Sequence, residues 1–89
     1  MATRDPGLRK RFGLAVQNAR RELGMSQEEL ADRSNLQVSF ISRIERGLQA
    51  PSLEAIASLA AAFGRKPHLL VKAAENQEEP QIESQHPVT

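Results

Sequence analysis

The sequence contains no cysteine, tryptophan or tyrosine, and only three phenylalanines. Without cysteine, neither a disulfide framework nor a thiolate metal site can form. Three aromatic residues are too few for a platform that stacks single-stranded nucleic acid. The two histidines, His68 and His86, do not fall into a His/Asp/Glu cluster with metal-ligand spacing. No serine–histidine–acid set is apparent, so we expect no enzyme, no metal and no cofactor.

Long apolar runs are also missing. None approaches the roughly 20 residues that a membrane-spanning helix needs, and no signal-peptide pattern opens the chain. We therefore expect a soluble cytoplasmic protein without a membrane partner, and no small-molecule effector is evident. A chain of 89 residues holds one domain at most, and domains this small are marginally stable and commonly dimerise.

The net charge of +1 conceals an asymmetry. Residues 1–72 contain all twelve Lys and Arg with seven of the eleven acids, a net charge of +5, whereas residues 73–89 contain four acids and no base. A basic domain with an acidic tail suits a polyanion partner, but a solvated surface with a solubilising tail explains it equally well. Residues 76–89, with two prolines and little to bury, are expected to be a disordered acidic tail on a domain spanning 1–75.

Turn signals recur along the chain at Gly24, Asn35, Gly47 and Gly64, and no segment alternates like a strand. We therefore predict an all-α fold. The first helix is expected to begin with Asp5 as N-cap and Pro6 at the first position, and to end at Leu23. The other helices are expected over about 27–34, 38–46 and 53–63, and from Pro67 to near Glu75. The apolar stripes of the first and fourth helices comprise Leu8, Phe12, Val16, Ala19 and Leu23, and Leu53, Ile56, Leu59, Ala60 and Phe63.

The second and third predicted helices form a tight pair. Ser26 and Glu29 have capping-box spacing, which predicts a helix start at Gln27. Ala31 is small where the two helices would cross, and Asn35 tolerates the positive φ that the turn requires. Leu36, Ile41 and Ile44 would then fill the angle between them. This spacing is typical of a helix-turn-helix, whose second helix enters the DNA major groove, although a helical bundle with another role stays open.

Three segments in order, Met25–Ala31, Phe40–Gly47 and Pro51–Glu54, resemble the Cro/C1-type (Xre) helix-turn-helix repressors. The resemblance covers roughly residues 10–72. It implies a compact five-helix, lambda-repressor-like domain that binds double-stranded operator DNA as a homodimer. The alternatives are a helical adaptor for protein contacts and an antitoxin-type partner-binding module.

The resemblance also implies roles for single residues. Val38, Ser39 and Arg43 match the positions that read base edges, with Arg43 foremost because a guanidinium can grip guanine O6 and N7. Arg20 and Glu45 match an ion pair that links the first and third helices, a structural role. The residues expected to contact the DNA backbone are Gln27, Gln37, Ser42, Arg46, Gln49 and Arg20.

The sequence departs from the pattern of this family at three places. Gln37 stands where an N-cap would be Ser, Thr or Asp, Asn35 replaces the usual glycine, and the loop 48–50 carries no lysine or arginine. Because this loop has no positive charge, we expect weaker binding to DNA and a shallower dependence of that binding on salt. Phe63, Leu69, Leu70 and Val71 are expected either to form a dimer interface or simply to close the core. A dimer through this region would place the two third helices about 34 Å apart, one turn of DNA.

Overall fold

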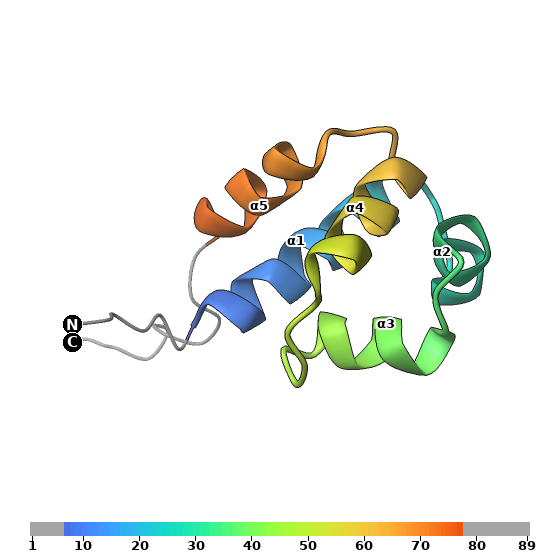
Figure 1. Cartoon of the computed structure of the whole chain (residues 1–89), viewed down its shortest axis with the longest axis horizontal. Helices are drawn as coiled ribbons and strands as arrows, with labels where there is room; N and C mark the ends of the chain where they lie inside the picture. Colours follow the sequence, from blue (N-terminus) through green and yellow to red (C-terminus); the bar gives the residue numbers. More distant parts are fainter. Residues whose placement is uncertain (1–6, 78–89) are drawn as a thin grey trace, which may run out of the picture.

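The structure, a computed structural model, describes residues 7–77 and builds that part of the chain from five α-helices without a strand (Figure 1). The helices are α1 (Leu8–Glu22), α2 (Gln27–Ser34), α3 (Val38–Glu45), α4 (Leu53–Ala62) and α5 (Pro67–Glu75). The predicted five-helix, all-α fold is confirmed. Of the tail expected over 76–89, Asn76 is the C-cap of α5, and residues 78–89 lie outside the described residues.

The start predicted for the first helix is wrong. The helix α1 begins at Leu8, with Gly7 as an N-cap that makes no side-chain hydrogen bond. Asp5 and Pro6 themselves lie outside the described residues. The ends of the predicted stripes are also wrong, because Leu23 is 49% and Leu53 81% exposed. An apolar stripe is buried only where another helix covers it, and helical periodicity does not reveal where that cover stops.

The predicted start and end of α2 are confirmed in detail. The Ser26 hydroxyl accepts a hydrogen bond from the Glu29 amide at 3.0 Å, and the Ser26 amide donates to Glu29 Oε1 at 2.9 Å. At the other end, Asn35 adopts φ 60° and ψ 34°, in the left-handed region. These local contacts set the tight turn between α2 and α3.

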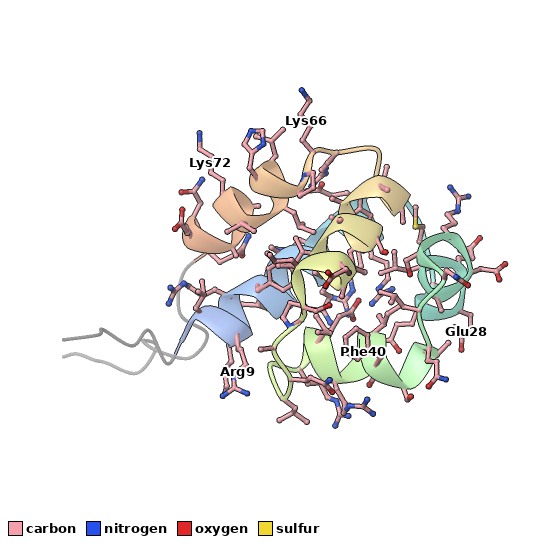
Figure 2. All side chains as sticks on the ribbon, in the orientation of Figure 1. Arg9, Glu28, Phe40, Lys66 and Lys72 are labelled. Carbon is pink, nitrogen blue, oxygen red and sulfur yellow. The ribbon has the colours of Figure 1, made fainter. Side chains whose placement is uncertain are left out.

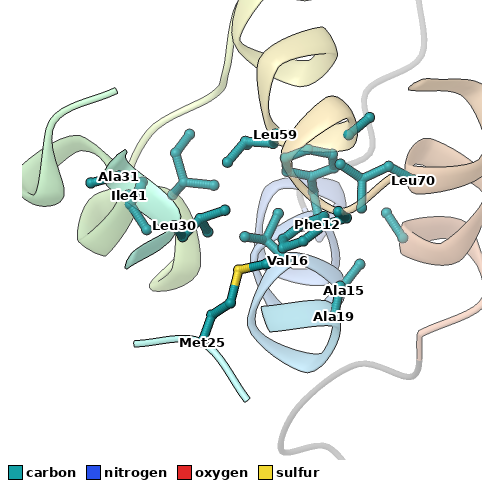
Figure 3. Packing of buried hydrophobic residues seen from close by; sticks show 14 residues of the cluster. Phe12, Ala15, Val16, Ala19, Met25, Leu30, Ala31, Ile41, Leu59 and Leu70 are labelled. Atoms are coloured by element: carbon teal, nitrogen blue, oxygen red, sulfur yellow. The ribbon is translucent and has the colours of Figure 1, made fainter. Parts of the chain in front are cut away.

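The core surrounds the middle of α1. Val16, Leu30, Ile41 and Leu70 are completely buried. Figure 3 shows Phe12 and Val16 of α1 between Leu30 and Ile41 on one side and Leu70 on the other. Accordingly, α1 packs against both α3 and α5, which lie on opposite sides of it in Figure 1.

A close backbone approach determines where α3 sits. A Cβ atom added to Gly13 would lie 2.3 Å from the carbonyl oxygen of Ile44 and 2.7 Å from that of Glu45. Only glycine therefore allows α1 and α3 to cross at this distance. Glycine inside a helix ordinarily only weakens it, whereas Gly13 is the point at which α3 packs directly against α1.

Candidate nucleic-acid interface

The outer face of α3 is the candidate interface. Ile41, Ile44 and Glu45 are buried on the inner face of α3. On the outside, Val38, Ser39, Arg43 and Arg46 are exposed and Ser42 is half-buried. In Figure 2, α3 lies along the lower edge of the molecule, and its outer side chains extend away from the other helices. The residues proposed to read bases thus share one accessible surface.

A buried network supports this surface from behind. Arg20 donates from Nε to Glu45 Oε2 at 2.7 Å and from Nη2 to Glu45 Oε1 at 3.0 Å. Its Nη1 donates to the backbone oxygen of Met25 at 2.8 Å. Gln27 Nε2 donates to Glu45 Oε1 at 3.0 Å. The network ties α1 and the start of α2 to the end of α3, and contains the ion pair expected from the resemblance.

The electrostatics of the pair favour its charged form. The hydrogen bond to Glu45 raises the pKa of the Arg20 guanidinium, burial opposes the shift, and the negative charges of Glu45 and Glu28 add to it. Each Arg20 nitrogen donates one hydrogen bond within the protein, and only 10% of the side chain is exposed. The structure therefore shows the structural role of Arg20, and a DNA backbone contact through its remaining N–H groups stays a prediction. Gln27 keeps that possibility, because an amide nitrogen carries two hydrogens and one bond to Glu45 uses only one.

The N-terminal end of α3 has no side-chain cap. Gln37 occupies the N-cap position in extended conformation and its side chain makes no cap hydrogen bond, as the absence of Ser, Thr or Asp there led us to expect. The first backbone amides of α3 therefore receive no side-chain cap, and they lie at the positive end of the helix dipole. A phosphate oxygen can satisfy such amides.

The C-terminal end of α3 contains a contact that the sequence did not indicate. Arg43 Nε donates to Gln49 Oε1 at 2.7 Å, and Arg46 Nε donates to the backbone oxygen of Ser42 at 3.4 Å. From the sequence alone, Arg43 is expected to contact bases and Gln49 to contact phosphate, as two separate side chains. The structure joins the two side chains.

Basic residues of α1 lie beside this end of α3, and sequence reasoning missed them. A Cβ atom added to Gly47 would lie 2.6 Å from Lys10 Cγ, so the lysine stem packs directly against the turn after α3. Figure 2 shows Arg9 on the same lower side as α3, whereas Lys66 and Lys72 point to the opposite side. No periodicity could have revealed this, since Lys10 and Gly47 are far apart in the chain.

The residues expected at a dimer interface divide between core and surface. Phe63 is 7% exposed and Leu70 is completely buried, so both belong to the monomer core. Leu69 is 44% exposed. Val71 is half-buried and lines an open apolar groove of about 280 Å³ together with Leu8, Pro51 and Ile56 among others. The exposed part of that expected interface is therefore reduced to Leu69 and Val71.

Other kinds of site receive no support within the described part of the chain. Residues 7–77 contain no group of three His, Asp or Glu side chains placed to hold a metal ion. In the same range, no helix is both long enough and apolar enough to cross a membrane.

A capped α2, a left-handed turn residue and an exposed α3 on a five-helix scaffold define the class of helix-turn-helix DNA-binding transcription regulators. Residues 16–70 match the model of a family described as helix-turn-helix. The chain belongs to this family, of the Cro/C1 type, whose members are DNA-binding regulators rather than enzymes.

Two curated relatives illustrate the match. The transcriptional regulator DdrOP3 of Deinococcus deserti is 33% identical over 60 residues, which cover 67% of this chain and 46% of the relative. The uncharacterized regulator y4dJ of Sinorhizobium fredii is 37% identical over 57 residues, covering 64% of this chain and 74% of the relative. The chain thus spans less than half the length of the first relative.

Solved structures share the fold. The restriction-modification controller protein C.AhdI from Aeromonas hydrophila has a TM-score of 0.68 and 37% identity, covering 70% of this chain and 94% of that one. The clp gene regulator ClgR from Corynebacterium glutamicum has a TM-score of 0.74 and 30% identity, covering 83% and 95%. A mutant of the controller C.Esp1396I, bound to its highest affinity operator site, has a TM-score of 0.67 and 27% identity, covering 79% and 97%.

Proposed function

We propose that this helix-turn-helix regulator binds a specific, near-palindromic operator in duplex DNA as a homodimer, and acts as a repressor or controller. The observation that carries the proposal is the exposed face of α3, held from behind by the Arg20–Glu45–Gln27 network. A buried three-way contact fixes the angle at which a helix meets a groove. Access to duplex DNA would place the protein in the cytoplasm.

Base reading is assigned to three side chains of α3. Arg43 is proposed to donate two hydrogen bonds to guanine O6 and N7, a pairing that discriminates against the wrong base by ~1–3 kcal/mol. Val38 has no hydrogen-bonding side chain, so the methyl group of thymine is its target. Ser39 can serve a base edge or a phosphate.

The phosphate contacts are assigned to Gln27, Gln37, Ser42 and Arg46, and to Lys10 and Arg9 of α1. The position of Lys10 against Gly47 supports its inclusion, because it supplies from another helix the cation that the loop 48–50 lacks. Lys10→Gln should weaken operator and random duplexes alike and lower the slope of log Kobs against log salt by about one. Lys72→Gln, on the opposite side, is the matched control and should change neither quantity.

The dimer is proposed to form through α5, around Leu69 and Val71. The exposure of Leu69 on the short helix α5 supports this assignment. Leu69→Glu should lower the weight-average mass in sedimentation equilibrium and weaken operator binding, while the circular dichroism melting curve stays close to that of the wild type. Binding as a monomer to a single half-site would contradict the dimer without contradicting DNA recognition.

Selection of bound duplexes from a random pool, followed by sequencing, tests the proposal as a whole. It should recover two inverted half-sites spaced by about one turn of DNA. Arg43→Met should then weaken operator binding far more than random-duplex binding. If no sequence is enriched at low salt, specific DNA recognition is refuted and a protein-contact adaptor is favoured instead.

A further inference from the structure

We propose that Gln49 is a positioning residue that aims the Arg43 guanidinium, so that only its two terminal nitrogens meet the guanine. The inference rests on the proposed function, because it assigns Gln49 a role in base reading by Arg43. It also replaces the phosphate contact that the sequence suggested for Gln49.

The contact itself has one possible chemistry. A guanidinium only donates hydrogen bonds, so the atom of Gln49 that faces Arg43 must be the amide oxygen. The Nε–Oε1 distance of 2.7 Å is short, as expected when the donor is charged. With Nε occupied, the remaining donors of Arg43 are the hydrogens on Nη1 and Nη2. Those two nitrogens form the edge that can bind guanine O6 and N7 together.

The turn after α3 places Gln49 where it can do this. The Leu48 amide donates to the Arg43 carbonyl oxygen at 2.9 Å, and the Gly47 amide donates to the Ile44 carbonyl oxygen at 3.0 Å. Gly47 has φ 74°, so this is a Schellman turn that closes the helix with two backbone bonds. Because residue 48 is bonded to the backbone of Arg43, the next residue is held within reach of the Arg43 side chain.

An open hollow beside Arg43 offers its side chain a second orientation. Arg43 borders an open hollow of about 350 Å³ together with Asn35, Leu36, Gln37 and Phe40, which lie toward the N-terminal end of α3. A long flexible side chain without an anchor would spread over both directions and lose rotamer freedom when it binds a base. The bond to Gln49 holds the Arg43 side chain in one orientation and removes part of that entropic cost before DNA arrives.

A double-mutant cycle distinguishes positioning from phosphate contact. Wild type, Gln49→Met, Arg43→Met and the double variant are titrated by fluorescence anisotropy with three duplexes. These are the selected operator, the same operator with the Arg43-dependent G·C pair exchanged for A·T, and a random duplex. Methionine matches glutamine in length and lacks the acceptor oxygen.

Gln49→Met is expected to reduce discrimination at that base pair by about 3–10-fold, the net size of one ordinary intramolecular hydrogen bond, because the Arg43–Gln49 contact is exposed to solvent. Its affinity for the random duplex should stay unchanged. In the Arg43→Met background it should change no affinity by more than about 2-fold, since nothing remains to be positioned. Gln49→Glu should restore discrimination because it keeps an acceptor oxygen, although its charge weakens binding to every duplex.

Three outcomes would overturn the inference. An equal loss on all duplexes that persists in the Arg43→Met background would make Gln49 a phosphate contact. Unchanged discrimination would make the bond irrelevant, and tighter operator binding would mean that it masks Arg43. Each of these differs from failure of the proposed function, in which the random pool gives no operator or Arg43→Met has no base-specific effect.

Discussion

Replacing Arg20 with methionine is expected to destabilise the fold by about 3–5 kcal/mol, the typical cost of removing one partner from a buried ion pair. Methionine preserves most of the packing of the arginine stem. It removes the two bonds to Glu45 and the bond to the Met25 carbonyl oxygen. Among residues 7–77, the Glu45 side chain, 1% exposed, would then keep only Gln27 as a hydrogen-bond donor.

The size of this loss is large for so small a domain. At about 0.05–0.15 kcal/mol per residue, a fold of this length has a total stability of roughly 4–11 kcal/mol. The loss should therefore lower the melting temperature by about 12 °C or more, given about 4–8 °C per kcal/mol for small domains. Since Glu45 raises the pKa of Arg20, the stabilisation is complete below the ordinary arginine pKa and is lost only as pH rises through the raised value. Titration of Arg20 should therefore leave the stability of the fold unchanged between about pH 6 and 9.

The assay is urea and thermal unfolding followed by circular dichroism at 222 nm, for Arg20→Met, Glu45→Met and the double variant. The double variant should recover much of the stability that either single variant loses, because it leaves no uncompensated charge. An Arg20→Met protein within about 1 kcal/mol of the wild type would refute the reasoning, because hydrogen bonds to a buried carboxylate should be worth more than that. Additive single effects would equally show that the two side chains are not coupled.

Three further predictions concern the backbone that presents α3. Gly13→Ala should cost about 1–3 kcal/mol of stability, the range for overpacking, and should weaken operator binding, because its Cβ would meet the carbonyl oxygens of Ile44 and Glu45. Wild-type stability in urea unfolding together with wild-type operator affinity by fluorescence anisotropy would contradict this prediction. Ser26→Ala should cost about 1 kcal/mol through loss of the α2 cap, measured against Ser58→Ala, which occupies no cap position. Asn35→Ala should cost about 1–2 kcal/mol at φ 60°, whereas Asn35→Gly should be neutral or stabilising; equal melting curves for the two variants would exclude a conformational cause.

Local features of the fold could be predicted from the sequence because their causes are local. The capping box needs only Ser26 and Glu29, three residues apart. Asn35 adopts the left-handed conformation because asparagine itself tolerates positive φ. Such signals act within one turn, so they predict the order and ends of α2 and α3 without knowledge of the remaining chain. The Arg20–Glu45 pair is different, because it was expected from the resemblance to a family and not from spacing.

Burial at the helix ends could not be predicted in this way. Leu53 belongs to the apolar stripe of α4 by periodicity and yet is largely exposed, while neighbouring residues of α5 divide into a buried Leu70 and an exposed Leu69. Periodicity shows which side of a helix is apolar. How far along the helix that side is covered depends on the neighbouring helices.

By itself, then, the sequence determined an all-helical chain with a helix-turn-helix between Ser26 and Arg46, since caps and turn residues act over a few positions. Only the tertiary structure decided how that unit presents its outer face. Gly13 lets α3 approach α1, and Lys10 of α1 packs against Gly47 at the end of α3. The Schellman turn at Gly47 brings Gln49 to Arg43. The approach of Gly13 and Lys10 to α3 depends on distances between residues remote in the chain, and packing in three dimensions alone sets them.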